Sequence, residues 1–253
     1  MKKTTPIQSV IDIQNLKKSF GNLEVLNDVS LQLHKEENLV VLGKSGSGKS
    51  VLIKCIVRLL KADEGTINVL GSEINSLKIE ELNEVRKKIG FLFQSGALYD
   101  SMTVKENLEF SLLNIKHDLT ESEINTKVAE ALENVGLNDV LYKMPSELSG
   151  GMRKRISLAR TIIVNPEIML YDEPTTGLDP VTANEISELI NDIQKKYKTA
   201  SIIITHDIEC VRTVADRILM IKEGKVYKEG TLSEFENSTD SYVSSFFKTK
   251  KQK

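Results

Sequence analysis

The stretch GKSGSGKS, residues 43 to 50, decides the fold. It matches the pattern G-x-x-x-x-G-K-[ST] in full, and this pattern forms a loop whose backbone N–H groups surround phosphate oxygens. The continuous apolar run NLVVL (38–42) precedes it and predicts a strand buried on both faces of a parallel sheet. The segment KSVLIKCIVRLL (49–60) follows with helical spacing. Strand, glycine loop and helix in this order are the context that a phosphate loop requires.

Most positions of this loop have an expected role. Glycines let the backbone approach phosphates closely, Lys49 is expected to reach the β- and γ-phosphates, and the Ser50 hydroxyl is expected to bind Mg²⁺. A glycine-rich turn without a ligand is the alternative, and the complete strand–loop–helix context argues against it. The expected nucleotide contacts are Gly43, Lys44, Ser45, Gly46, Ser47, Gly48, Lys49, Ser50 and Val51.

A pair of carboxylates follows another apolar run, in IMLYDEP (168–174). Ligands of open α/β sheets bind at the carboxyl ends of strands, which is where this pair is expected. We assign Asp172 to hold Mg²⁺, usually through its water, and Glu173 to polarise the attacking water. A solvated acidic strand end is the alternative, and it is weak beside a complete phosphate loop.

Two further polar residues end predicted strands. His206 follows SIIIT (201–205), and Gln94 follows KIGFLF (88–93). A lone histidine is more often structural than catalytic, but this position favours a role in which the imidazole bridges the γ-phosphate and the attacking water. The Gln94 amide oxygen is expected to reach Mg²⁺ or the same water.

The order of elements predicts an α/β fold with a mainly parallel sheet, because strand signals alternate with helical stretches. Residues 94–165 have a helical character instead, with capping boxes at Thr103–Glu106 and Thr120–Glu123 and a stop at Gly136. We therefore predict a nucleotide-binding core, an inserted helical subdomain, and a C-terminal extension with its tail. The expected bounds are 1–93 with 166–230, then 94–165, then 231–253.

The composition is that of an ordinary soluble protein. Thirty-four Lys and Arg residues stand against 36 Asp and Glu residues, for a net charge of −2, so no electrostatic signature of nucleic-acid binding is present. Cys55 and Cys210 are expected to be reduced core residues of a cytosolic protein. The start MKKTTPIQSV does not read as a secretory signal, and no stretch approaches the roughly 20 apolar residues that span a bilayer. A membrane segment, if one is needed, is expected on another chain.

A second glycine-containing stretch, LSGGMRKR (148–155), remains to be explained. Its glycine pair opens a basic helical run, and helix starts of this kind favour anions. The chain thus carries two segments suited to phosphate, of which the first is by far the stronger match.

Together these motifs resemble the nucleotide-binding subunits of ABC transporters over nearly the whole chain. Six occur in family order: the phosphate loop, Gln94, LSGGM (148–152), MLYDE (169–173), TTGLDP (175–180) and His206. The resemblance implies a P-loop NTPase (RecA-like) core with an N-terminal antiparallel β subdomain and an inserted helical subdomain. A small kinase, which also has a phosphate loop, has no place for the LSGGM segment.

The resemblance also implies ATP and Mg²⁺ as cofactors and a homodimer that encloses two ATP molecules. Ser149, Gly150 and Gly151 of one chain are then expected to contact the nucleotide held by the partner's Lys49, together with Asp179. Phe20 takes the place of the aromatic residue that stacks on adenine, an interaction worth about 1–3 kcal/mol.

A finer resemblance rests on FQSGALYDSMTV (93–104), ELSGGMRKR (147–155) and YDEPTTGLDPVTA (171–183). These stretches are similar to the ATPase of the Mla/Mce-type phospholipid transporters. That likeness implies lipid transport, a membrane permease and a membrane-anchored Mce-domain protein as partners, and a location on the cytoplasmic face of the inner membrane.

Residues 95–107 are expected to receive a helix of the permease, with Leu98, Tyr99 and Met102 providing apolar contact area. The alternative is a tight turn of small residues in which at least one of these three side chains packs inward. The lysines of FFKTKKQK (246–253) suit anionic lipid headgroups, although a solvated tail is the simpler interpretation.

Other ABC proteins stay open as alternatives. These are the ATPase of a transporter for another substrate, and a soluble assembly ATPase of the iron–sulfur scaffold class. Translation- or chromosome-associated ABC proteins resemble tandem repeats of this domain or carry long coiled coils, and neither feature occurs in this sequence.

Overall fold

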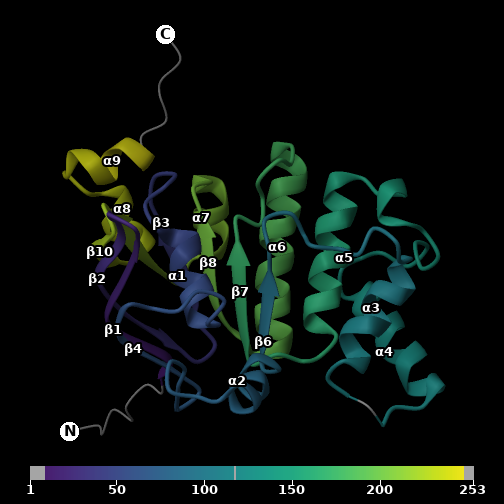
Figure 1. Cartoon of the computed structure of the whole chain (residues 1–253). Coiled ribbons are helices and arrows are strands. Elements are labelled where there is room, and N and C mark those ends of the chain that lie inside the picture. The colour runs from purple at the N-terminus through teal and green to yellow at the C-terminus, as the bar shows by residue number, and fades with distance from the viewer. Residues whose placement is uncertain (1–8, 117, 248–253) are drawn as a thin grey trace, which may run out of the picture.

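The structure is a computed structural model that describes residues 9–116 and 118–247 (Figure 1). Its strands form two sheets in this described part of the chain. The first sheet is antiparallel, in the order β2-β1-β4-β5. Its strands are β1 (Ser9–Phe20), β2 (Leu23–His34), β4 (Glu64–Val69) and β5 (Ser72–Glu73).

The second sheet has the order β10-β9-β3-β8-β7-β6. Its pairs are parallel from β9 to β6, and β10 alone runs antiparallel to its neighbour. The carboxyl ends of the parallel strands therefore meet at one edge, which is at the top in Figure 1. The strands are β3 (Asn38–Leu42), β6 (Ile89–Leu92), β7 (Ile168–Asp172), β8 (Ala200–Thr205), β9 (Arg217–Lys222) and β10 (Lys225–Gly230).

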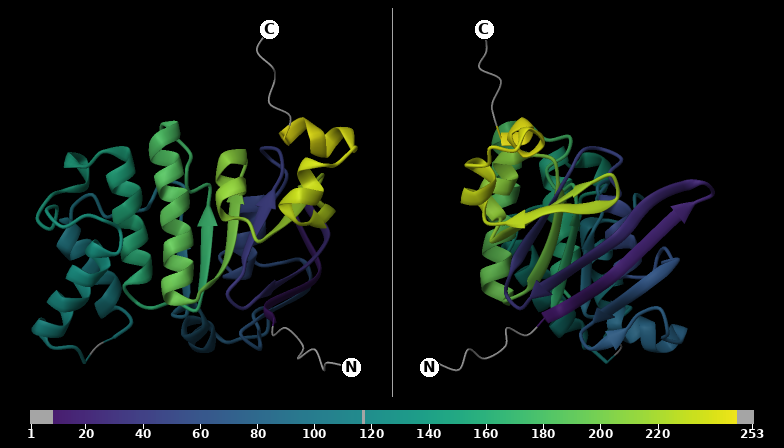
Figure 2. Two further views of the ribbon diagram at one scale, coloured as in Figure 1. Left: turned by 180° about the vertical axis from the view of Figure 1, so that it is seen from behind. Right: turned by 90° about the vertical axis from the view of Figure 1, so that its left-hand side faces the viewer.

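Strand β3 is buried along its whole length, as its unbroken apolar run predicts, because both faces of its sheet are covered. Leu39 and Val41 pack toward α1 (Lys49–Ile56) and the antiparallel sheet. Val40 and Leu42 belong to the core on the other face, which is covered by helices. Figure 2 shows the antiparallel sheet and helix α6 on opposite sides of the central strands.

Helices α3 to α9 contribute to the core on the second face, whereas α2 packs with the first face through Leu82 and Val85. Capping boxes start α3 and α4 at Thr103 and Thr120, so both predicted boxes are confirmed. The helices are α2 (Ile79–Arg86), α3 (Val104–Leu113), α4 (Glu121–Glu133), the 3₁₀ turn η1 (Pro145–Glu147), α5 (Gly150–Ile162), α6 (Pro180–Tyr197), α7 (Ile208–Val214), α8 (Leu232–Glu236) and α9 (Ser241–Phe247). The architecture confirms the predicted α/β fold with an antiparallel sheet, and the subdomain bounds stay a prediction.

Two local expectations need correction. The helix expected over 49–60 ends at Ile56, because Arg58 adopts a φ of 51° and donates its guanidinium to the carbonyls of Ile74 and Leu77. Strand β10 has no counterpart among the predicted strands. It follows a tight turn in which Glu223 and Gly224 both have positive φ, the geometry that a two-residue hairpin requires.

Both cysteines lie in the core as free thiols, as predicted. Burial raises the pKa of Cys55 to about 11 and that of Cys210 to about 12, so neither thiol ionises at neutral pH. Within residues 9–116 and 118–247, no helix is both long enough and apolar enough to span a bilayer.

Candidate functional site

A cavity of about 680 Å³ opens at the carboxyl edge of the parallel sheet. Three of its lining residues come directly after a parallel strand: Gly43 follows β3, Glu173 follows β7 and His206 follows β8. This is the edge at which open α/β sheets bind ligands. The lining residues are Val25, Gly43, Lys44, Ser45, Gly46, Gly48, Lys49, Ser50, Val51, Gln94, Glu173, His206 and Phe246.

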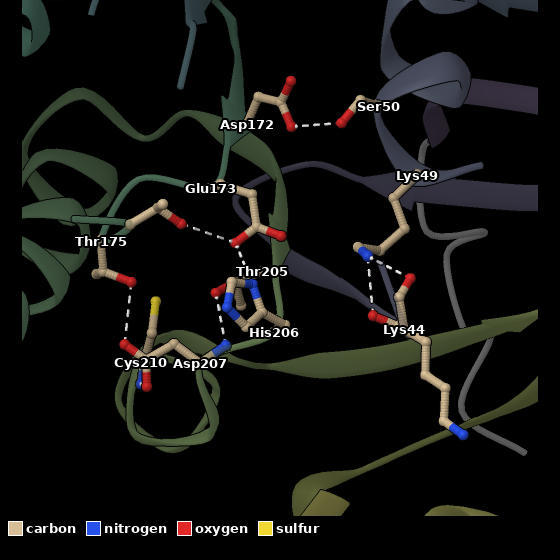
Figure 3. A network of polar contacts seen from close by, with 12 residues as sticks. Lys44, Lys49, Ser50, Asp172, Glu173, Thr175, Thr205, His206, Asp207 and Cys210 are labelled. Atoms are coloured by element: carbon tan, nitrogen blue, oxygen red, sulfur yellow. Dashed lines mark hydrogen bonds and ion pairs between the residues drawn. The ribbon is translucent and has the colours of Figure 1, made fainter. Parts of the chain in front are cut away.

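The glycine loop has the geometry of a phosphate cradle. Gly48 has a φ of 98°, and a Cβ atom there would lie 2.7 Å from both the Leu26 side chain and the Val25 carbonyl oxygen, so only glycine fits. The buried Lys49 ammonium donates to the carbonyl oxygens of Gly43 at 2.8 Å and Lys44 at 3.0 Å (Figure 3). Two neutral carbonyls leave this cation without a full counter-charge, which suits an anionic ligand.

Electrostatics support the same fit. Burial lowers the pKa of Lys49, and the carboxylates of Glu173 and Asp172 act against this effect. A phosphate in the loop would provide the negative charge that this buried cation lacks. Ser47, an expected contact, does not line the cavity, and its buried hydroxyl finds no hydrogen-bond partner among the described residues.

Two of the expected metal ligands, Ser50 and Asp172, lie next to each other. Ser50 Oγ donates to Asp172 Oδ1 at 2.8 Å, and Asp172 is almost fully buried (Figure 3). No cluster of three or more His, Cys, Asp or Glu side chains suited to a metal occurs in the described ranges. This donor set fits Mg²⁺, which is usually held by one or two carboxylates together with substrate phosphates and water.

Glu173 and His206 are in direct contact. His206 Nδ1 lies 2.8 Å from Glu173 Oε2, and Thr176 Oγ1 donates to the same oxygen at 3.3 Å. The Glu173 backbone adopts a φ of 52°, which is uncommon for a residue with a side chain, and its N–H bonds to the Ile204 carbonyl. The sequence placed both residues at the site, but their direct bond was not foreseen.

Gln94 lines the cavity, and a residue that the sequence analysis missed holds it there. Lys154 of α5 is nearly fully buried, and its ammonium donates to the Gln94 carbonyl oxygen at 2.5 Å. Burial lowers the Lys154 pKa, while Asp172 and Glu173 act against this effect. Its position inside the basic run 148–155 gives no local signal that this one cation faces inward.

Comparison with known proteins decides the family. The sequence profile described as "ABC transporter" matches residues 26–176. The chain belongs to the ABC transporter family. It is therefore an ATP-hydrolysing cassette. A similar solved structure is the dimeric ATP-binding cassette MJ0796 in a post-hydrolysis state with ADP and Pi. It superimposes on 88% of this chain and 98% of its own chain, with a TM-score of 0.81 and 31% sequence identity.

Relatives of this ABC ATPase differ in the cargo that their names state. The intermembrane phospholipid transport ATP-binding protein MlaF of Haemophilus influenzae is 38% identical, over 95% of this chain and 91% of its own length. The glutamine transport ATP-binding protein GlnQ of Bacillus subtilis is also 38% identical, over 89% of this chain and 92% of its own. Overall identity therefore fixes the family and leaves the cargo open.

The second glycine segment of this ABC chain lies outside the main cavity. Ser149 caps α5 by accepting the Met152 N–H, and Asp179 caps α6 in the same way with the N–H groups of Val181 and Thr182. Neither side chain lines the cavity, and Gly150 instead borders a smaller one of about 170 Å³. Within one chain, the structure thus does not bring LSGGM (148–152) to the phosphate loop.

Phe20 is likewise absent from the cavity lining. It ends β1 with 47% of its surface exposed, and its contact is with the Lys18 ammonium, 5.3 Å from the ring centre. The aromatic side chain that does line the cavity is Phe246 of α9. The sequence analysis missed Phe246, because no local pattern shows that α9 returns to the phosphate loop.

Proposed function

We propose that this chain is the ATPase of a lipid-transporting ABC transporter, acting as a homodimer beneath a membrane permease on the cytoplasmic face of the inner membrane. A membrane-anchored Mce-domain protein is the further partner. The observation that carries the cargo assignment is the similarity to MlaF over nearly the full length of both chains. The resemblance of residues 93–104 to Mla/Mce-type ATPases supports it.

In this proposal the cavity residues hold and hydrolyse ATP with Mg²⁺. Bound Mg²⁺ neutralises charge on the phosphates. Lys49 binds the β- and γ-phosphates, and Ser50, Asp172 and Gln94 hold the metal. Glu173 accepts the proton of the attacking water, since its carboxylate is only 12% exposed and points toward the cavity.

The bond to His206 gives Glu173 a defined orientation. Because Thr176 and His206 both contact Oε2, the other carboxylate oxygen, Oε1, is left to face a water. His206 is itself 62% exposed at its side chain, so a bound γ-phosphate has access to it. We assign His206 to contact both Glu173, the general base, and the γ-phosphate, and so to hold the two at a fixed distance.

The homodimer completes each site. We assign Ser149, Gly150, Gly151 and Asp179 to the nucleotide of the partner chain, which accounts for their place outside the cavity of their own chain. The free N–H groups at the start of α5 are suited to a γ-phosphate. A dimeric structure of the similar cassette MJ0796 supports this mode of assembly.

A second cavity, of about 500 Å³, is the proposed permease site. Tyr99 and Phe110 form its aromatic rim, with ring centres 5.0 Å apart and exposed fractions of 45% and 39%. The Arg160 guanidinium lies 5.8 Å from the Tyr99 ring and donates to the Ala97 carbonyl. A rigid aromatic rim of this kind is suited to a partner helix.

Two of the expected contact residues differ in position. Leu98 is half-buried, packs against the main core and is absent from the lining of the second cavity. Tyr99 lines that cavity, and Phe110 joins it from α3.

The docking test changes this rim. We expect the double variant Tyr99→Asp, Phe110→Asp to leave ATP binding by the purified chain within about twofold of wild type, because neither residue lines the first cavity. Membrane association in cell fractions should fall at least about tenfold, the loss expected when two anchor side chains are removed. Tyr142→Asp is the matched control, since Tyr142 is 76% exposed away from this rim. Unchanged membrane association of the double variant rejects the docking site.

The cargo test compares two transport phenotypes in a deletion strain. Lipid transport predicts an altered distribution of phospholipids between envelope membranes and normal glutamine uptake. The opposite pattern supports the alternative raised by the equal similarity to GlnQ. If the wild-type chain is found only in the soluble fraction of cells, the result supports the soluble assembly class.

A further inference from the structure

We propose that Phe246 of α9 contacts the nucleoside part of bound ATP and closes the side of the cavity that Phe20 leaves open. This inference rests on the proposed ATP site and adds a specificity residue to it. Figure 1 shows α9 at the end of the molecule to which the parallel strands point, where the phosphate loop also lies.

Helix α9 is firmly anchored to the core. Val243 and Phe247 are buried in the helical face of the core, and the Phe247 ring lies 6.0 Å from the ring of Phe235 in α8. Asp240 accepts the Val243 N–H and, at 2.7 Å, the Tyr227 hydroxyl of β10. Phe246 itself packs partly against the same core, so the packing of its helix fixes its position.

A chain of aromatic contacts connects α9 to the phosphate loop. The Tyr242 ring meets the rings of Tyr227 and Phe246 edge to face, at 5.3 and 5.4 Å. The ammonium of Lys44, a loop residue, lies 5.2 Å from the Tyr242 ring centre, and that of Lys222 lies 4.6 Å from it. Cation–π contacts of this kind hold α9 beside the loop.

The chemistry of Phe246 points to the nucleoside. Its ring has no hydrogen-bond donor and no charge, so it offers nothing to a phosphate. The apolar lining of the cavity consists of Val25, Val51 and Phe246, and Phe246 provides the one apolar aromatic ring among the described lining residues. A half-buried ring beside a phosphate loop is suited to an aromatic base, because every base presents a π-face.

The first experiment uses the absence of tryptophan from the sequence. Phe246→Trp introduces a single tryptophan as a fluorescent reporter at the proposed contact. Phe20→Trp is the matched control, with the single tryptophan at the exposed end of β1. We expect ATP to change the emission of the Phe246→Trp variant saturably, and inorganic tripolyphosphate, which lacks a base, to leave it unchanged. No response to saturating ATP overturns the proposal.

The second experiment measures affinity and does not depend on the indole. We expect Phe246→Ala to weaken ATP binding about tenfold, the loss of about 1.4 kcal/mol of stacking, with tripolyphosphate binding unchanged. Equal weakening of both ligands indicates that α9 acts through the loop, and it overturns the base contact. A tenfold loss in Phe20→Ala with none in Phe246→Ala assigns the base to Phe20 instead. If wild type binds neither ligand, the ATP site itself fails.

Discussion

At the scale of the residue, Glu173 concentrates the chemistry of the site. It has a left-handed backbone conformation, a hydrogen bond to His206 and a neighbouring hydroxyl from Thr176. Backbone conformations of this kind cost about 1–3 kcal/mol and persist where the surrounding structure imposes them. The β7 and β8 strand ends impose it here, through the bond from the Glu173 N–H to the Ile204 carbonyl.

We expect Glu173→Gln to bind ATP about as well as wild type and to hydrolyse it at least about a hundredfold more slowly. The amide keeps the shape of the carboxylate but is too weak a base to take a proton from water. Single-turnover hydrolysis and nucleotide binding measured on the same preparation separate the two effects. Glu167→Gln is the control, because Glu167 is an exposed acid paired with Lys88. Wild-type turnover in Glu173→Gln removes Glu173 from the role of base.

At the scale of the element, one face of α5 holds the loop that follows β6. Lys154, Ser157 and Arg160 are spaced three residues apart and all face this loop. Lys154 and Arg160 donate to the carbonyls of Gln94 and Ala97, and a Cβ atom on Gly96 would lie 2.6 Å from the Ser157 hydroxyl. Ser149 caps the start of the same helix. Helix α5 therefore connects the loop after β6, which lies at the nucleotide of its own chain, with LSGGM (148–152), the segment proposed to reach the nucleotide of the partner chain.

We expect Lys154→Met to fold, to bind ATP within about threefold of wild type, and to lose at least about tenfold in turnover. Methionine fills the buried space, but the Gln94 carbonyl loses its partner, a loss of about 1.5–3 kcal/mol for a bond to a charged group. Lys154→Arg, which restores a cation, should recover part of the turnover. The exposed Lys195 of α6 provides the control Lys195→Met. A loss in ATP affinity equal to the loss in turnover points to a purely structural lysine.

Prediction from sequence succeeded where a signal is local. The buried strand β3, both threonine capping boxes and the strand–loop–helix order around residues 43–50 depend on neighbouring residues, and each is confirmed. It failed where tertiary position decides. Lys154 reaches Gln94 and Phe246 reaches the cavity only because α5 and α9 pack there. The contact of Phe20 with adenine, which the family resemblance implies, stays a prediction, and Phe20 does not line the cavity.

At the scale of the whole molecule, the two glycine segments lie apart in one chain. The cavity contains the phosphate loop, Glu173 and His206, whereas Ser149 and Asp179 cap helices outside it. A two-fold dimer lets each chain present its second segment to the other's cavity. Two complete sites then require two chains.

Mixing two inactive variants tests this arrangement. Gly150→Asp is suited to the second segment, because an added Cβ atom meets only the Leu178 side chain at an ordinary 3.5 Å, whereas at Gly151 it would lie 2.6 Å from Thr182. We expect Gly150→Asp and Lys49→Ala each to be inactive alone. Their mixture should regain up to about one quarter of wild-type ATPase activity, since half of randomly mixed two-fold dimers are heterodimers with one intact site. Full activity of Gly150→Asp alone contradicts the shared site.

The two main cavities share no lining residue, and this separation has a pharmacological consequence. The first is formed largely by the backbone of a glycine motif, so a compound that fills it faces nearly the same surface in any protein with that motif. The second is lined by side chains such as Tyr99, Phe110 and Arg160, and the glycine motif places no constraint on these side chains. Selective inhibitors of this ATPase are therefore better sought at the aromatic rim than at the phosphate loop.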